Sequence, residues 1–267
     1  MNSIKKSMIL LGLSSLLASA QVVLLTDNFN AGTGTTSTSG AAIGTTGWKN
    51  FTGSEAKEYN VASSGDLEIR NQISDVATDS VSHDFSATSL VSVGDSISVS
   101  FKFQVFGDTA GSINNTNAGF RVQFVDSTQV ANSGYGINIA SGTNTSNNFI
   151  KGTSTIPSGA LTYNVDETVF TDVVFTLTKV STGIQLSGSI GGTSFSNANN
   201  PIDSTYSTFD RLVFSVAALE QGGRIDDVTV TSIPEPSTKG MLVGLGFGFG
   251  FLTFLQRRSN LRARSIL

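Results

Sequence analysis

The sequence predicts an all-β protein whose central part, residues 21–232, folds as an antiparallel two-sheet sandwich. Apolar and polar residues alternate along many short segments, as they do in strands that bury only one face. The connections between these segments are rich in Thr, Asn, Gly and Ser, which favour turns, and no amphipathic helix longer than two turns separates them. About 210 residues are enough for one sandwich with a sizeable core.

The clearest strands share strict alternation. In the segment VSFKFQVF, Phe101 and Phe103 point to one face, while Lys102 and Gln104 point to the other. Ser181–Gly183 is a turn that joins two such segments into a hairpin. The strands predicted with this pattern are Val99–Phe106, Phe120–Val125, Thr168–Val180, Ile184–Ile190, Arg211–Val216 and Ile225–Val230.

Shorter segments supply further strands, which brings the expected total to between ten and thirteen. An irregularity is expected at Asp172–Val173 inside the longest strand. The shorter strands are Val22–Leu25, Leu67–Arg70, Val81–Phe85 and Tyr135–Ile139. Long surface loops are predicted at Gly32–Gly47, Gly111–Ala118, Ala140–Asn148 and Asn197–Ser207.

The charge of the central part argues against a polyanionic partner. Residues 21–232 hold 19 acidic and 9 basic side chains, a net charge of −10, whereas the whole chain carries only −4. A domain this acidic is repelled by the phosphates of nucleic acid and by anionic lipid. The chain has no cysteine, which excludes thiolate nucleophiles and Cys-ligated metal centres.

The first twenty residues have the three parts of a signal peptide. Lys5 and Lys6 are positively charged, and the apolar stretch Met8–Leu17 that follows is too short for a stable membrane anchor. Ala18 and Ala20 provide the small residues that precede a cleavage site, so cleavage is expected before Gln21. The alternative, a buried N-terminal helix, has no helical partner downstream.

Residues 233–267 form a second terminal segment. Pro234-Glu235-Pro236 ends the last strand, because proline cannot donate to a strand ladder. The uncharged residues 240–255 follow, and a helix of this length covers about 24 Å, less than the roughly 30 Å hydrocarbon core of a bilayer. The basic tail, residues 256–267, contains Arg257, Arg258, Arg262 and Arg264. Positive residues stay on the cytoplasmic side, so the central domain is predicted outside.

This order of features resembles the PEP-CTERM sorting signal: a Pro-Glu-Pro motif, a short apolar helix and a terminal arginine cluster. The resemblance covers Ile233–Leu267. It implies a Gram-negative bacterium that makes extracellular polysaccharide, and processing near the motif by an exosortase, an integral-membrane cysteine transpeptidase. It also implies export, anchoring in the inner membrane by the helix, and then delivery to the envelope, the cell surface or the extracellular matrix. The alternative is an ordinary C-terminal anchor with a proline-containing stem.

The first and last strands of the central domain resemble those of concanavalin-like and laminin-G-like jelly rolls. The residues that carry the resemblance are Thr26–Phe29 near the start and Arg224–Val228 near the end. In that fold these two strands lie side by side. Asp27, Asp226 and Asp227 would then meet and could bind a structural calcium ion through hard oxygen ligands. Isolated surface carboxylates are the alternative, and no other cofactor is expected.

Catalytic patterns are weak. His83 is the only histidine, and no G-x-S-x-G elbow accompanies it, so we interpret it as a strand histidine with Asp84 on the opposite face. The acidic pairs Asp166-Glu167 and Asp226-Asp227 are adjacent in sequence, so on a strand they point to opposite faces rather than into one cleft. These observations predict that the protein is not an enzyme.

Three roles therefore remain for the exported domain. The first is a structural or adhesive component of a polysaccharide-rich coat, and the second is a glycan-binding module. Trp48, beside Gly47 and Lys49, could lie at a turn and stack on a sugar, or equally could lie in the core. The other available rings are Tyr59, Tyr135, Tyr163 and Tyr206. The third role is that of a divergent polysaccharide hydrolase.

Replacing Pro234 and Pro236 by alanine should leave the protein anchored in the membrane and unprocessed, because the processing enzyme would no longer recognise its motif. Immunoblots of membrane and culture fractions, with the unaltered protein alongside, measure the effect. Release of the variant to the same extent as the unaltered protein would contradict processing at this motif.

Overall fold

The described part of the chain is an all-β structure. The computed structural model describes residues 20–30, 34–36, 42–43, 46–52, 58–61, 65–70, 79–107, 119–129, 133–140, 147–152, 154–161, 169–198, 200–217 and 221–234. The predicted signal sequence up to residue 19, the residues from Glu235 onward with their apolar segment and arginine tail, Tyr163 and the Asp166-Glu167 pair lie outside these ranges. Gln21–Ile233 forms one compact unit.

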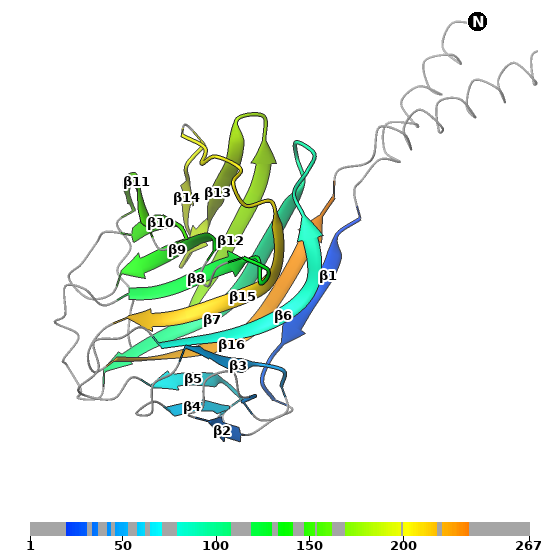
Figure 1. Ribbon diagram of the computed structural model, residues 1–267. Helices are drawn as coiled ribbons and strands as arrows, with labels where there is room; N and C mark the ends of the chain where they lie inside the picture. The colour runs from blue at the N-terminus through cyan, green and yellow to red at the C-terminus, as the bar shows by residue number, and fades with distance from the viewer. Residues whose placement is uncertain are drawn as a thin grey trace, which may run out of the picture. The chain divides into compact units, whose positions relative to one another are not determined.

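Two antiparallel sheets make up this unit, as the alternation predicted (Figure 1). The first sheet runs in the order β14 (Thr193–Ser196), β13 (Gly183–Ile190), β12 (Thr171–Val180), β7 (Ser96–Gly107), β16 (Gln221–Ile233), β5 (Leu67–Arg70), β4 (Glu58–Val61), β2 (Gly34–Thr36), with β1 (Val22–Asp27) also paired to β16. The second sheet runs in the order β11 (Ser154–Leu161), β10 (Asn147–Lys151), β9 (Gly134–Ala140), β8 (Gly119–Val125), β15 (Thr208–Ala217), β6 (Asp79–Ser89), β3 (Lys49–Thr52).

All ten strands predicted from alternation are confirmed. The described residues form sixteen strands in total, so the expected ten to thirteen was too few. β2 lies inside the segment predicted as the loop Gly32–Gly47, and β10 begins at the end of another predicted loop. The expected irregularity at Asp172–Val173 is absent, because β12 pairs in continuous register with both β7 and β13. The strands that the sequence did not predict are β2, β3, β4, β10, β11 and β14.

The hairpin between β12 and β13 shows why a glycine closes it. Val180 pairs with Gly183, as the predicted turn requires. A Cβ atom on Gly183 would lie only 1.9 Å from the carbonyl oxygen of Ile202, which belongs to the segment that crosses over the hairpin. Ile184 and Ile202 exchange backbone hydrogen bonds of 2.6 and 2.9 Å there. A side chain at residue 183 would therefore displace this crossing segment.

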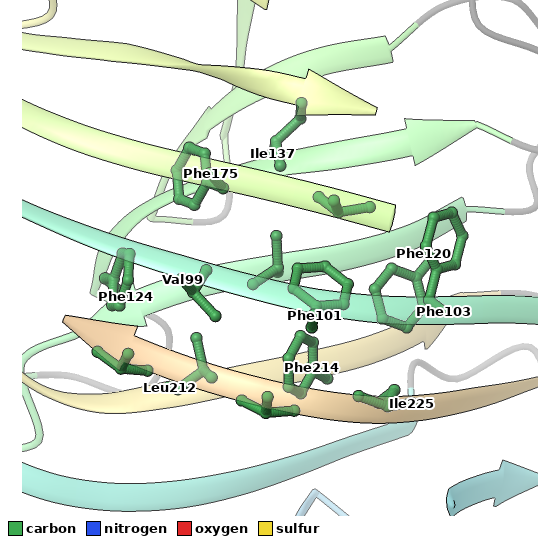
Figure 2. Packing of buried hydrophobic residues seen from close by; sticks show 14 of the residues in the cluster. Val99, Phe101, Phe103, Phe120, Phe124, Ile137, Phe175, Leu212, Phe214 and Ile225 are labelled. Atoms are coloured by element: carbon green, nitrogen blue, oxygen red, sulfur yellow. The ribbon is translucent and has the colours of Figure 1, made fainter. Parts of the chain in front are cut away.

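An aromatic layer fills the space between the sheets (Figure 2). Phe101 and Phe103 of β7 point inward from the first sheet, and Phe120 and Phe214 of the second sheet face them. The ring centroids of Phe101 and Phe214 are 4.8 Å apart, as are those of Phe103 and Phe120. Each of these side chains is at least 98% buried, and burying one contributes about 1.5–3 kcal/mol. The layer therefore fixes which face of each strand is internal.

The first and last strands lie side by side, as the jelly-roll resemblance implied. β1 pairs antiparallel with β16, with Asp27 opposite Val228. The register between β16 and β7 shifts between Asp226 and Thr229, and Asp227 adopts a φ of 51°. This β-bulge places one extra residue in β16 where the predicted carboxylates lie.

Phe214→Ala should lower the free energy of unfolding by about 3–5 kcal/mol, because it removes a ring that contacts Phe101, Phe120 and Trp48 and leaves a cavity. Urea unfolding followed by tryptophan fluorescence measures this loss. Val91→Ala is the control, since Val91 is 74% exposed and should change the free energy by less than about 0.5 kcal/mol. Equal effects of the two substitutions would contradict the assigned aromatic layer.

Candidate functional site

The face of the second sheet that points away from the core carries a polar row. On β8, Phe120, Val122 and Phe124 belong to the core, so Arg121 and Gln123 lie on the other face. The same alternation operates on the neighbouring strands β6, β15, β9 and β10. Strand pairing then aligns one row of five side chains across these strands: Ser80, Ser215, Arg121, Asn138 and Asn148. We call these five residues the Arg121 row.

The two ends of the Arg121 row differ in exposure. Ser80 and Ser215 are buried, and their hydroxyl oxygens are 3.0 Å apart in a hydrogen bond. Arg121 and Asn138 are half-buried and lie directly opposite each other on β8 and β9. Burial lowers the pKa of Arg121 from its ordinary value of 12.5, but the group stays protonated at neutral pH. The centre of the row therefore carries a positive charge.

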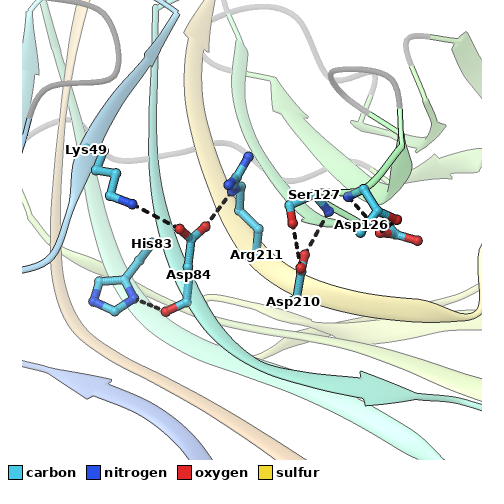
Figure 3. Close-up of polar contacts among 8 residues, drawn as sticks. Lys49, His83, Asp84, Asp126, Ser127, Asp210 and Arg211 are labelled. Carbon is cyan, nitrogen blue, oxygen red and sulfur yellow. Dashed lines mark hydrogen bonds and ion pairs between the residues drawn. The ribbon is translucent and has the colours of Figure 1, made fainter.

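Asp84 lies on the same face, four residues along β6 from Ser80, and contacts two cations (Figure 3). Its carboxylate accepts hydrogen bonds from Arg211 Nε at 2.6 Å and from Lys49 Nζ at 3.0 Å. Burial alone would raise the pKa of Asp84, but these two donors outweigh it and hold the pKa below the ordinary value. The Arg211 guanidinium also lies 5.4 Å from the ring centroid of Phe51. These charges satisfy one another, so we interpret the cluster as structural.

Asp210 and Asp126 stabilise the turn that follows β8 (Figure 3). The Asp210 carboxylate accepts hydrogen bonds from the backbone nitrogen of Ser127 at 2.7 Å and from its hydroxyl at 2.5 Å. The Asp126 carboxylate accepts from the backbone nitrogen and the hydroxyl of Thr128. Asp126 is thus engaged within the turn itself, whereas Asp210 holds the turn from the neighbouring strand β15.

His83 is a strand histidine, as the sequence indicated. Its ring packs against Trp48 at a centroid distance of 5.3 Å, while Asp84 points to the other face. His83 Nδ1 donates to the backbone carbonyl of Asp84 at 2.7 Å, not to a carboxylate. Gly47 has a φ of 82°, and a Cβ atom there would lie 2.7 Å from His83 Nε2. Among the described residues, no carboxylate is hydrogen-bonded to the His83 ring.

Trp48 occupies the core, the second of the two positions that the sequence left open. The residue has 0% exposure, and its ring stacks on Phe214 and tilts against Phe29. Its indole nitrogen donates to Asp27 Oδ2 at 2.9 Å. A ring without exposed surface has no face to offer to a sugar.

Two tyrosines are described with their side chains, and they form a pair. Tyr135 is fully buried, its ring lies 5.4 Å from that of Tyr206, and its hydroxyl donates to the backbone carbonyl of Asp203. Burial raises the pKa of Tyr135 to about 12. On the surface, hydrogen bonds from Lys151 and Thr205 lower the pKa of Asp203 to about 2. This group of residues fixes the loop before β15.

The three calcium candidates do not converge. Both carboxylate oxygens of Asp27 already accept hydrogen bonds, from the Phe29 backbone nitrogen at 2.8 Å and from the Trp48 indole. Asp227 pairs with Lys102 at 2.6 Å, and burial raises the pKa of Asp226. Among the described residues, no group of three or more His, Asp or Glu side chains is arranged to hold a metal ion. β1 and β16 do pair, but these three carboxylates do not form the group of ligands that the calcium alternative needed.

One pair of carboxylates was missed by the sequence reasoning. Asp66 and Glu68 lie two residues apart, so the core residue Leu67 between them leaves both on the same outer face. The two residues are buried, with exposed fractions of 4% for Asp66 and 3% for Glu68. Arg224 Nε lies 3.8 Å from Asp66 Oδ2 and 3.2 Å from Glu68 Oε2. The signal was the Asp-Leu-Glu alternation at the start of a predicted strand. One guanidinium thus faces both carboxylates of this pair.

The outer face of the first sheet is covered with hydroxyl groups. Its strands bury Val99, Phe175 and Val230 on one side and expose Ser or Thr on the other. Cross-strand pairs link some of these, as in the 2.8 Å hydrogen bond between Ser98 and Thr176. We call this surface the hydroxyl face, and define it by Ser98, Ser100, Thr176, Thr178, Ser187, Ser189, Ser194, Ser196, Thr229 and Thr231.

The comparisons with known proteins bear on the end of the chain and on the fold. Residues 232–258 match the PEP-CTERM protein-sorting motif, which confirms the resemblance drawn from Pro234, Glu235 and Pro236. The motif indicates an exported protein. No curated protein sequence matches the chain. In the described part of the chain, no helix has the length and apolarity needed to cross a membrane; the predicted apolar segment 240–255 lies outside that part.

Three solved structures are similar in their chain trace. The acidic lectin of winged bean, complexed with methyl-α-D-galactose, is 12% identical, with a TM-score of 0.47 and coverage of 80% of this chain and 98% of the lectin. The endo-1,3-β-glucanase of Streptomyces sioyaensis is also 12% identical, with a TM-score of 0.46 and coverage of 80% and 96%. The Emp47p carbohydrate recognition domain is 13% identical, with a TM-score of 0.44 and coverage of 80% and 95%.

Lys151→Ala should raise the pKa of Asp203 from about 2 toward its ordinary value of 3.8, because the substitution removes the strongest donor to this carboxylate. A lowered folded-state pKa stabilises the fold above the unfolded value, and this stabilisation is lost as the pH falls from about 4 to about 2. An NMR titration of the side-chain carboxyl carbon measures the shift.

Lys102→Ala is the matched control, since Lys102 pairs with Asp227 on the other sheet. It should leave the Asp203 titration unchanged. A midpoint near 3.8 for Asp203 in the unaltered protein would contradict the Lys151 ion pair.

Proposed function

We propose that this exported protein is a non-enzymatic structural and adhesive component of a polysaccharide-rich cell surface or extracellular matrix. The hydroxyl face carries the proposal. Ten Ser and Thr side chains on five strands form a surface of hydrogen-bond donors and acceptors. Each hydroxyl can both donate and accept, which suits contact with the hydroxyl groups of a hydrated polysaccharide.

The arrangement of the hydroxyl face favours many weak contacts over one tight site. Neighbouring strands are spaced by about 4.8 Å, so the side chains repeat at short, regular intervals. Thr178 and Thr231 are half-buried and have no hydrogen bond to another described side chain. Weak contacts that are repeated along a polymer add up to avidity without a deep pocket. This is the behaviour expected of a matrix component.

The placement of rings and carboxylates supports a non-catalytic role. Trp48 and Tyr135 are within the core, and Asp84, Asp203 and Asp227 are each paired with a cation. Glycan-binding modules use exposed rings, and glycosidases use two carboxylates that face a cleft. The glycan-binding alternative would therefore depend on other side chains.

Thr178→Val combined with Thr231→Val should weaken retention of the protein on the cell-surface polysaccharide of its own host, because both substitutions remove hydroxyls and keep β-branched side chains. The measurement is the protein fraction that co-sediments with the isolated insoluble polysaccharide. Thr182→Val combined with Thr193→Val is the matched control, since both residues are exposed outside the hydroxyl face. Equal retention of the two variants would count against the proposed adhesive surface.

The hydrolase alternative is tested with the same material. The proposed function predicts that the full-length protein, purified in a sugar-free non-ionic detergent, releases no reducing ends from the polysaccharide. Release that disappears in Glu68→Gln would overturn the non-enzymatic proposal and assign catalysis to the Asp66–Glu68 pair.

A further inference from the structure

We propose that Arg121 and Asn138 form a binding site for the carboxylate of an acidic sugar. The two side chains lie opposite each other on adjacent strands, with Cβ atoms expected about 4.5–5.5 Å apart. Both point away from the core, because Phe120 and Val122 on β8 and Ile137 and Ile139 on β9 are core residues. A guanidinium beside an amide offers several N–H donors on one side of the sheet.

Arg121 differs from the other arginines whose side chains are described. Arg211 is paired with Asp84, and Arg224 lies against Glu68 and Asp66. No described carboxylate pairs with Arg121, and burial lowers its pKa. Removing a cation from water without a counter-charge is unfavourable, and an anionic ligand would relieve that cost.

The described neighbours of Arg121 do not use its donors. Its neighbour Gln123 is satisfied within the protein, since its amide nitrogen donates to the Gly152 carbonyl at 3.0 Å. Ser80 and Ser215 bond each other. The Asn138 side chain has no hydrogen bond to a described group, and it is half-buried like Arg121. Among the described side chains of the Arg121 row, Arg121 and Asn138 thus lie opposite each other without a hydrogen bond to another described side chain.

Local charge also permits an anion here although the domain is acidic. Among the described acidic side chains of this face, Asp84 lies on β6 four residues from Ser80, and Lys49 and Arg211 neutralise it. A carboxylate would approach Arg121 without a facing negative charge. Carboxylates match the planar fork of a guanidinium in two parallel hydrogen bonds. The site itself rests on this geometry, and the choice of a sugar acid rests on the proposed matrix function.

The test is calorimetric titration of the full-length protein, in a sugar-free non-ionic detergent, with oligomers of polygalacturonate. Their methyl esters are the matched neutral probe. The protein should bind the acid saturably and the ester at least about tenfold more weakly, because the ester cannot form the charged pair. Arg121→Gln should weaken binding of the acid by about tenfold or more, and Arg121→Lys by less, since Lys keeps the charge and loses the fork.

Lys179→Gln is the control, because it removes one positive charge from a strand of the other sheet. It should bind the acid as the unaltered protein does. Arg121→Gln should also keep or raise the Tm without ligand, because it removes an unpaired, partly buried charge. A merely structural Arg121 would instead give a lowered Tm.

Three results would overturn the proposal: equal binding of acid and ester, equal binding by Arg121→Gln and the unaltered protein, or a Tm of Arg121→Gln lowered by several degrees. These outcomes are independent of the hydroxyl face. If Thr178→Val with Thr231→Val leaves retention unchanged while acid binding depends on Arg121, the adhesive proposal fails and the carboxylate site stands.

Discussion

Contact between aromatic rings across the two sheets is the constraint on which the rest of this structure depends. Phe101 and Phe103 of β7 meet Phe214 and Phe120 of the opposite sheet at centroid distances of 4.8 Å. Side chains alternate along a strand, so fixing one ring inside fixes every second residue outside. A shift of one residue would expose the rings and bury Lys102, which is why the register of β7 is so strongly determined. The chemistry of the outer faces follows from this register.

The two outer faces that result are different in kind. The hydroxyl face repeats Ser and Thr over five strands, so it is polar without needing many charges. The face around Arg121 has buried and half-buried side chains, and its charges are few and placed individually. A repeated polar surface favours diffuse contact with a polymer, whereas an isolated cation favours one group of opposite charge. The hydroxyl face and the Arg121–Asn138 pair therefore share no residues and suit different kinds of contact.

Sequence alone predicted the parts of the fold in which alternation is strong. The segment Ser96–Gly107 could be read because its aromatic residues recur at every second position. Two edge strands could not be predicted in this way: β14 has only four residues, and β11 contains Pro157. Such strands are recognised by their pairing with a neighbouring strand and not by alternation in their own sequence. Trp48 remained undecided in the sequence, since its burial depends on Phe214 and Phe29, which are distant in the chain.

The candidate sites show the same limit. Alternation places Arg121 on an outer face, but only the pairing of β8 with β9 and β15 shows that Asn138 and Ser215 flank it. The Asp66–Glu68 pair could have been found from its spacing, had the strand been started one residue earlier. The calcium prediction used a correct strand pairing, yet Trp48 and Phe29 already occupy the Asp27 carboxylate, a contact that local sequence does not encode.

The three outward arginines with described side chains show how one residue type takes different roles on one sandwich. Arg224 faces two carboxylates, Arg211 shares one with Lys49, and Arg121 faces none among the described residues. In the first two cases the protein itself balances the charge, so removing the arginine would leave a carboxylate without its partner. In the third case no described carboxylate balances the charge. An anionic ligand would lower the energetic cost of this half-buried charge, so among the arginines with described side chains Arg121 is the one that contacts within the described residues do not explain.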